Sequence, residues 1–368
     1  MTTKVAVLGA GNAGYATTAD LVRRGFDVTL FSHVREKLDP ISDRGGIEVN
    51  GVAGDSFVRF EDVTTDLELC VSGTEYIVLT VPQTAHEFYA KALSSYLKEN
   101  QVVVLNPGHT CGGMHFATTL RKAGYGGTAR LGEFHTMSFS ARIRNPGQVF
   151  VAHITKDLLF STFPGKLQDH LYPGVKNLFP NAVKAKNVLD SALRNINAIE
   201  HPAQIVLNAG WVEHTKGDYY FYYEGTTSSV GRVIDLVDGE RMRIAEALGI
   251  ETSPFVEILY EAGYTAKEAC EVGTAHMAFQ KSPEHRWSKG PKSLDHRYMH
   301  EDVGYGLVGM ANLARFAGVK TPVMDALIAL ASALNGIDYV LQGLTLEKIG
   351  LEGKKREELK EFLFEGYH

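Results

Sequence analysis

The chain has 368 residues, of which 44% are hydrophobic and 22% charged, which is close to average globular composition. At roughly 100–200 residues per domain, the length suggests two or three domains. Its 37 basic and 43 acidic residues give a formal net charge of −6, which leaves no basic footprint for nucleic acid. Three scattered cysteines without a CxxC pair argue against a disulfide framework and against the common kinds of structural zinc site.

Short apolar runs alternate with helix-length segments in the first half of the chain. Four runs rich in β-branched residues have the character of strands buried on both faces of a parallel sheet. They are residues 5–8, 28–31, 76–79 and 102–105. Helical segments lie between them, and shorter strands over 133–151 and a helix at 166–178 follow. The alternation predicts βαβ units, and therefore an α/β Rossmann-type domain with a mostly parallel sheet over residues 1–186.

A glycine-rich turn follows the first of these strands. It reads Gly9-Ala10-Gly11-Asn12-Ala13-Gly14 and opens a helix. In such a turn the first glycine permits the tight bend, the second lets backbone approach a pyrophosphate, and the third allows close packing of helix and strand. The anion then lies at the positive end of the helix. We expect these six residues to bind a dinucleotide.

The end of the second strand bears on which dinucleotide is bound. NAD enzymes usually place Asp or Glu there, about 20 residues past the fingerprint, whereas this chain has Ser32, followed by Arg35. These two residues favour NADP(H), with NAD(H) still open, because a guanidinium pairs well with a phosphate. Val81 and Pro82 follow the strand at 76–79 and are expected at the nicotinamide side, at the sheet edge where such folds bind ligand.

The second half is helical in pattern. Residues 189–214 are predicted to form one long helix interrupted at Pro202, and helical periodicity continues through the rest of the chain. We assign 187–368 to an all-α substrate-binding and catalytic domain, an arrangement like that of 6-phosphogluconate dehydrogenase. The longest apolar stretch, 322–341, contains three polar residues and fits a buried helix better than a membrane span. With no signal peptide apparent, we expect a cytoplasmic protein that does not bind membranes and forms a homodimer.

The predicted helix at 189–214 has a polar stripe. Asn197, His201 and Asn208 are spaced by four and seven residues and therefore lie on one face. Pro202 is predicted to bend the helix beside His201, because proline lacks the N–H and clashes with the preceding turn. The stripe is consistent with a catalytic histidine or equally with a core histidine that hydrogen-bonds to backbone.

A second polar cluster spans residues 295–302. His296 and His300 have the i, i+4 spacing of zinc ligands, but Arg297 stands where an HExxH motif needs glutamate. We therefore predict no metal site.

Several segments together resemble the opine dehydrogenase family of octopine/nopaline type, most closely its bacterial members that act on carboxyethyl-norvaline. Beyond the glycine-rich turn, the matching segments are Leu105-Asn106-Pro107-Gly108, Gly132-Glu133, Pro146-Gly147-Gln148-Val149, Asn195-Ile196-Asn197-Ala198 with His201-Pro202, Tyr223-Glu224-Gly225 with Ser229-Val230-Gly231, and Arg297-Tyr298 with Glu301-Asp302-Val303. One departure is Ser32, where the norvaline-type relative has aspartate, which puts strict use of NAD in doubt.

The resemblance implies an NAD(P)H-dependent reductive condensation of an amino acid with an α-keto acid, or the reverse oxidation. It implies that His201 and Asp302 form the catalytic pair, that Arg297 binds a substrate carboxylate and that Asn197 positions substrate. These residue types suit the chemistry, since histidine shuttles protons near neutrality and a guanidinium fork matches a carboxylate. The alternatives are a hydroxy-acid or ketopantoate-type dehydrogenase, which would reduce a keto acid without an amine, and a non-catalytic NAD(P) sensor.

Overall fold

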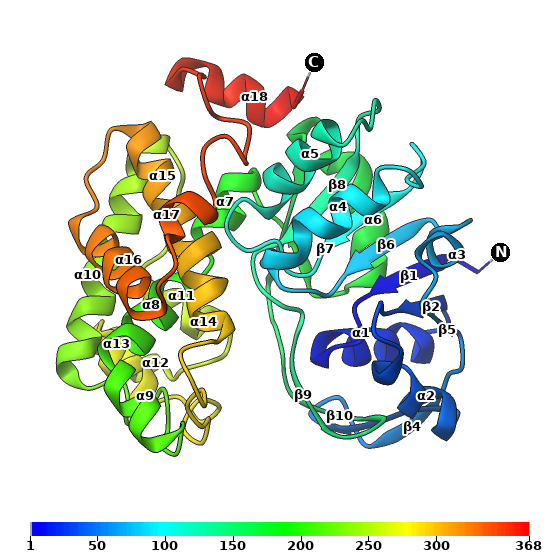
Figure 1. Cartoon of the computed structure of the whole chain (residues 1–368), viewed down its shortest axis with the longest axis horizontal. Coiled ribbons are helices and arrows are strands. Elements are labelled where there is room, and N and C mark those ends of the chain that lie inside the picture. Colours follow the sequence, from blue (N-terminus) through cyan, green and yellow to red (C-terminus); the bar gives the residue numbers. More distant parts are fainter. Residues whose placement is uncertain (1, 368) are drawn as a thin grey trace. The chain divides into compact units, whose positions relative to one another are not determined.

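The computed structural model describes residues 2–367, which divide into two compact units (Figure 1). The first contains residues 2–108, 112–188 and 360–367, and the second contains 109–111 and 189–359. Residues 360–367, which the sequence analysis assigned to the helical domain, thus belong to the first unit. There the Phe362 ring lies 5.2 Å from that of Phe163, and the Tyr367 hydroxyl hydrogen-bonds to Thr118.

The first unit is built on an eight-stranded sheet of order β12-β11-β8-β7-β6-β1-β2-β5, parallel except for the antiparallel pair of β11 and β8. Its strands are β1 (Lys4–Leu8), β2 (Asp27–Phe31), β5 (Val63–Thr64), β6 (Tyr76–Leu79), β7 (Val102–Leu105), β8 (Arg130–Phe134), β11 (Leu158–Phe163) and β12 (Ala182–Lys184). The four apolar runs predicted as strands are the adjacent central strands β7, β6, β1 and β2. The predicted Rossmann-type α/β domain is confirmed.

A smaller sheet of order β4-β3-β10-β9 covers α1 (Asn12–Arg23) on the side away from the main sheet (Figure 1). Its strands are β3 (Gly46–Gly51), β4 (Ser56–Arg59), β9 (Phe139–Asn145) and β10 (Gln148–Ile154). The remaining helices of this unit are α2 (Asp39–Arg44), α3 (Leu67–Val71), α4 (His86–Leu93), α5 (Gly112–Lys122), α6 (Gln168–Leu178) and most of α18 (Leu359–Glu365). The helix α1 is therefore buried on two faces, which holds the glycine-rich turn at its start.

The second unit is helical, as predicted. Its helices are α7 (Val188–Leu193), α8 (Asn197–Leu207), α9 (Ala209–Thr215), α10 (Ser228–Leu248), α11 (Phe255–Glu261), α12 (Lys267–Val272), α13 (Ala275–Gln280), α14 (Arg297–His300), α15 (Val308–Ala317), α16 (Pro322–Asn335) and α17 (Tyr339–Gln342). The longest, α10, packs against α8, α13, α15 and α16. Thr227 caps its N-terminus, where the threonine hydroxyl accepts a hydrogen bond from the N–H of Val230.

The predicted single helix over 189–214 is wrong, since α7, α8 and α9 are three separate helices. Pro202 lies inside α8, where the helix continues past it at the loss of one backbone hydrogen bond to Ala198. The later break falls at Asn208, whose side-chain amide donates to the carbonyl oxygens of Gln204 and Gly225 at 2.7 and 3.0 Å. A polar side chain that satisfies free carbonyl groups therefore ends α8, and the proline does not.

The segment before α15 is a π-helix, η4 (Asp302–Leu307). Its wider turn is marked by the N–H of Gly306, which donates to the carbonyl of Glu301 five residues earlier at 3.0 Å. A Cβ atom at Gly306 would lie 2.6 Å from that of Ala198, so only glycine lets η4 approach α8 this closely. The close approach places the start of η4, Asp302, beside the middle of α8.

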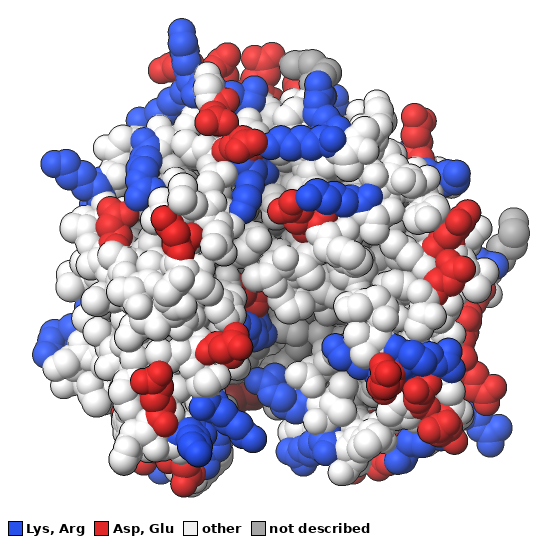
Figure 2. Space-filling view, viewed as in Figure 1, with Lys and Arg blue, Asp and Glu red and all other residues white. Residues whose placement is uncertain are grey.

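Acidic and basic side chains are mixed over the face of the molecule in Figure 2, and neither sign forms a broad patch there. Among residues 2–367 no helix is both long and apolar enough to cross a membrane.

Candidate active site

The glycine-rich turn of the first unit has the geometry of a phosphate-binding turn. Gly9 has φ +115°, which favours glycine, and a Cβ at Gly14 would lie 1.7 Å from the carbonyl oxygen of Gly9. A Cβ at Gly11 would meet no atom within 4 Å, so the space over the start of α1 is open. The Asn12 side chain is held to one side, accepting a hydrogen bond from the N–H of Ile143 at 2.8 Å. Backbone at the N-terminus of α1 is therefore accessible, which fits a dinucleotide pyrophosphate.

The end of β6 is fixed to this turn. The hydroxyl of Thr80 donates to the carbonyl of Gly9 at 2.9 Å, and a Cβ at Gly9 would lie 2.7 Å from Cγ1 of Val81. Val81 and then Pro82 thus follow β6 directly beside the turn, at the carboxyl edge of the parallel strands where such folds bind ligand.

Ser32 and Arg35 lie just beyond β2. Ser32 is buried, and its hydroxyl oxygen accepts from the N–H of Val34 at 3.1 Å, which closes a tight turn. Arg35 begins the short helix η1 (Arg35–Lys37), and its Nε lies 2.7 Å from Oδ1 of Asp39. Because this ion pair is about half exposed to solvent, it is weak enough for Arg35 to exchange partners.

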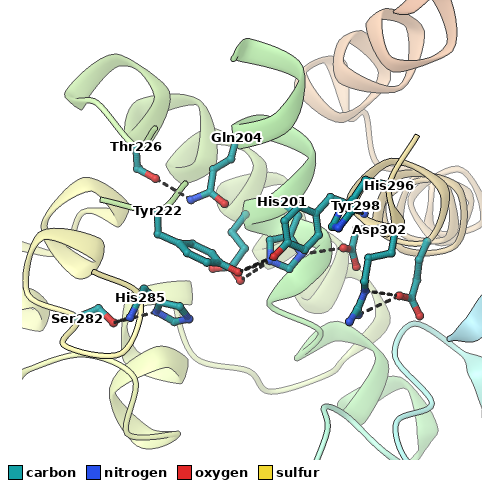
Figure 3. A network of polar contacts seen from close by, with 12 residues as sticks. His201, Gln204, Tyr222, Thr226, Ser282, His285, His296, Tyr298 and Asp302 are labelled. Carbon is teal, nitrogen blue, oxygen red and sulfur yellow. Dashed lines mark hydrogen bonds and ion pairs between the residues drawn. The ribbon is translucent and has the colours of Figure 1, made fainter. Parts of the chain in front are cut away.

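His201 is the centre of a buried polar network in the second unit (Figure 3). Its Nδ1 lies 2.7 Å from Oδ2 of Asp302, and its Nε2 lies 2.8 Å from the hydroxyl of Tyr222. Oε1 of Glu200 is a third neighbour, 3.3 Å from Nε2. The Tyr298 ring stacks on the imidazole with centroids 3.8 Å apart, so both nitrogens and one face of His201 are occupied by side chains.

Arg297, on α14, is oriented by a carboxylate. Its Nε and one terminal nitrogen each lie 2.9 Å from Oε2 of Glu301. The other oxygen of Glu301 lies 3.5 Å from Nε2 of His109, a buried residue in the loop after β7. The second terminal nitrogen of Arg297 has no contact of this kind among the described residues and is available to a substrate carboxylate.

Burial shifts the protonation of this cluster. It raises the pKa of the Asp302 carboxyl to about 7, a rise that the nearby Arg297 opposes. Burial, together with the charge of Asp302, raises the pKa of Glu200 well above its usual value, and burial lowers the pKa of His109. The pair of His201 and Asp302 therefore holds a proton near neutral pH, and Glu200 is a second buried acid beside it.

Among the described residues, no group of three or more His, Cys, Asp or Glu side chains could hold a metal ion. His296 caps the N-terminus of α14, where its Nδ1 accepts a hydrogen bond from the N–H of Tyr298. Nε2 of His300 lies 2.8 Å from Oδ1 of Asp295.

Both halves of the chain match known families. Residues 184–335 match the model of the NAD/NADP octopine/nopaline dehydrogenase alpha-helical domain. Residues 4–119 match that of the NAD-dependent glycerol-3-phosphate dehydrogenase N-terminus. An opine dehydrogenase from Arthrobacter sp. (strain 1C) is 35% identical over 348 residues, 95% of each chain. The chain belongs to the opine dehydrogenase family. It is an NAD(P)-dependent oxidoreductase that acts on a CH–NH bond.

More distant opine dehydrogenases share the whole fold. Octopine dehydrogenase from Pecten maximus is 24% identical over 93% of each chain. The solved structure of octopine dehydrogenase with NADH and L-arginine superposes with a TM-score of 0.76 at 20% identity, over 100% of this chain and 99% of that one. Yersinopine dehydrogenase with NADP+ gives 0.72 at 13% identity, over 99% and 98%. A ketopantoate reductase, the fold of the alternative considered from sequence, gives 0.62 over 91% of this chain and 99% of the other.

In this opine dehydrogenase the structure brings His201 and Asp302 together. Arg297 begins α14, the short helix that directly precedes η4 and its first residue, Asp302. Asn197 begins α8, one turn before His201, and its side chain is partly exposed. The rest of the polar stripe has structural partners, with Gln204 donating to the hydroxyl of Thr226 at 2.7 Å.

Sequence reasoning missed three members of this cluster, Tyr222, Glu200 and His109. Glu200 was detectable, because it is a lone carboxylate in an apolar stretch of helix directly beside a candidate catalytic histidine. Tyr222 has no local signal, since it lies outside regular helices and reaches its partner only in the folded chain. His109 lies in the loop directly after β7, at the sheet edge where such folds bind ligand, and this position was the signal that could have found it.

Proposed function

We propose that this opine dehydrogenase condenses the amino group of an amino acid with an α-keto acid and reduces the resulting imine, using His201 and Asp302 as its acid–base pair. The observation that carries the proposal is the 2.7 Å contact of these two buried side chains. A histidine held by a carboxylate has its tautomer and orientation fixed, as in other His–Asp pairs.

Proton transfer is the part of the reaction that falls to the pair. The amino acid must lose one ammonium proton to become a nucleophile, and the hydroxyl of the adduct must gain one to leave as water. Neutral His201 accepts the first proton and, as imidazolium, returns one for the second step. Asp302 stabilises the imidazolium through Nδ1 and keeps Nε2 directed away from itself.

Arg297 binds the carboxylate of the α-keto acid in this proposal. Glu301 fixes the plane of the guanidinium through two contacts, which leaves one terminal nitrogen to face the substrate. Orientation of this kind lowers the barrier because the keto carbon is held in a defined place. Asn197, at the start of the same helix as His201, is assigned to substrate positioning.

The nicotinamide cofactor supplies the hydride, and residues of the first unit would hold it. The turn from Gly9 to Gly14 would bind the pyrophosphate, and Val81 with Pro82 would line the nicotinamide side. NADP(H) is the favoured form, with NAD(H) possible, because Ser32 stands in place of a carboxylate and Arg35 is nearby. If Arg35 contacts a 2′-phosphate, Arg35→Ala should raise KM for NADPH roughly 10- to 100-fold and leave NADH kinetics nearly unchanged. An equal loss with both cofactors would refute this assignment.

The experiment that tests the acid–base pair is a double-mutant cycle. His201→Asn should lower kcat by ~10²–10⁴-fold with cofactor affinity intact, Asp302→Asn should lower it nearly as much, and the double variant should lose little more, because members of one unit are non-additive. His300→Asn, a partly exposed histidine bonded to Asp295, is the matched control and should stay near wild type. A His201→Asn enzyme with native turnover would overturn the assignment.

Substrate choice is tested by offering NADPH or NADH, an α-keto acid and each amino acid in turn. Turnover of the keto acid without an amine would favour a hydroxy-acid dehydrogenase instead. The homodimer stays a prediction.

A further inference from the structure

We propose that Tyr222 is the catalytic residue that passes protons between His201 and the substrate, so that the substrate meets the tyrosine hydroxyl and not the imidazole. The inference rests on the proposed role of His201 and adds a residue that no local sequence pattern marks.

The position of Tyr222 blocks direct access to the reactive nitrogen. Its hydroxyl lies 2.8 Å from Nε2 of His201, the only ring nitrogen not turned to Asp302. The imidazole is 4% exposed, and one face is covered by the Tyr298 ring at 3.8 Å. A substrate that contacted Nε2 would therefore have to displace the hydroxyl of a side chain that is itself packed against Phe279 and His285, at ring centroid distances of 5.3 and 4.3 Å.

The charge of His201 decides which way the Tyr222 hydroxyl points. When Asp302 is ionised, Nδ1–H donates to it, so in neutral His201 the other nitrogen, Nε2, is an acceptor and the tyrosine hydroxyl donates to it. In the imidazolium, Nε2–H donates to the tyrosine oxygen, and the hydroxyl proton is free to be given to another acceptor. The hydroxyl is thus an acid toward the substrate only when His201 is charged.

The dehydration step then balances as a two-proton transfer. Tyr222 gives its hydroxyl proton to the leaving oxygen of the amine–keto acid adduct, and the C–O bond breaks with release of water as the nitrogen lone pair forms the C=N bond. Nε2 of His201 gives its proton to the tyrosine oxygen at the same time, so no phenolate persists. His201 ends neutral, and the reverse sequence serves the oxidative direction.

Other ionisable groups face this hydroxyl. The hydroxyl of Tyr298 lies 3.3 Å away, Glu200 adjoins the same His201 nitrogen, and His285 packs against the Tyr222 ring. Arg297 and Asp302 complete the charged surroundings. Tyr298 is the more exposed of the two tyrosines. In this proposal the substrate therefore approaches Tyr222 and His201 from the side on which Tyr298 lies.

The test is Tyr222→Phe, which keeps the ring and removes the hydroxyl. We expect kcat for condensation to fall by ~10²-fold or more, with the melting temperature, the Kd of NADPH and KM for the keto acid near wild type. A preformed cyclic imine carboxylate needs no loss of water, so its reduction should be far less affected. Tyr219→Phe is the matched control, because it removes a buried hydroxyl that has no partner among the described residues, and it should leave every constant unchanged.

The outcomes separate this proposal from the one it rests on. If Tyr222→Phe keeps native kcat while His201→Asn is inactive, the relay is wrong and the acid–base pair stands; if both keep it, both proposals fall. Should Tyr222→Phe lose its fold, wild-type kcat in mixtures of H2O and D2O decides. A curved dependence on the deuterium fraction supports two protons in motion, and a straight line overturns the relay.

Discussion

Gly14 and Gly11 of the glycine-rich turn are predicted to have different roles. Alanine at Gly14 should destabilise the fold, whereas alanine at Gly11 should weaken cofactor binding without loss of stability. A Cβ at Gly14 would lie 1.7 Å from the Gly9 carbonyl oxygen, whereas real contacts essentially never fall below 3.0 Å. To reach that separation, α1 or the turn must move by more than an ångström. Overpacking of this kind costs about 1–3 kcal/mol, and each kcal/mol lowers Tm by roughly 2–4 °C in a domain of 150–250 residues.

Gly11→Ala should do the reverse. Its Cβ meets no atom within 4 Å, and its φ of −93° suits any residue, so Tm should stay near wild type. The new methyl group fills the space through which a pyrophosphate approaches, so the Kd of NADPH should rise about tenfold or more, an energy of at least ~1.4 kcal/mol. Thermal melts and cofactor titration by fluorescence measure both quantities. Native cofactor affinity in Gly11→Ala, or an unchanged Tm in Gly14→Ala, would refute the reasoning.

Three further predictions concern the buried cluster. Burial raises the pKa of Asp302 to about 7, so the Asp302–His201 pair keeps its proton up to that pH. The reductive kcat should therefore fall as pH rises through about 7, and the oxidative kcat should rise. Flat pH profiles from pH 5 to 9 would contradict this prediction. The pKa of Glu200 is raised, so the folded protein binds this proton more tightly than the unfolded chain and loses stability as pH rises above 4.5. In urea unfolding, the free energy of unfolding of Glu200→Gln should equal that of wild type at pH 4 and exceed it at pH 8. Arg297→Lys keeps the charge but loses the planar guanidinium fork. KM for the keto acid should rise roughly 10- to 100-fold, which corresponds to the ~1.5–3 kcal/mol of a charged hydrogen bond, and the Kd of the cofactor should stay unchanged. Native keto-acid kinetics would remove Arg297 from the site.

Features with a local cause were predictable from sequence. The central strands are continuous apolar runs, and the turn at Gly9 needs conformations that glycine supplies, so both can be read from neighbouring residues. His201 was selected because polar side chains recur on one face of a helix. The same helix also led to an error. We predicted that Pro202 interrupts it, whereas the break falls at Asn208, which ends α8 through its own hydrogen bonds.

Features that depend on distant contacts were not predictable. The strands β3 and β4 form half of a sheet whose other half lies about 100 residues later, with Glu48 paired to Gln148. Tyr222 belongs to a segment without regular helix, and only the packing of the second unit brings it to α8. The nature of η4 also depends on tertiary contact, because the pattern of apolar residues at 303–316 is the same for an α-helix.

The π-helix η4 sets the angular position of Asp302 around the helix axis. A π turn holds one residue more than the α-helical turn it replaces, and each residue of an α-helix advances about 100° around the axis. If Asp302–Leu307 relaxed to an α-helix continuous with α15 at unchanged length, everything before it would rotate by about 100°. Asp302 would then point away from α8, and His201 would lose its partner. The wide turn is therefore what keeps these two side chains facing each other.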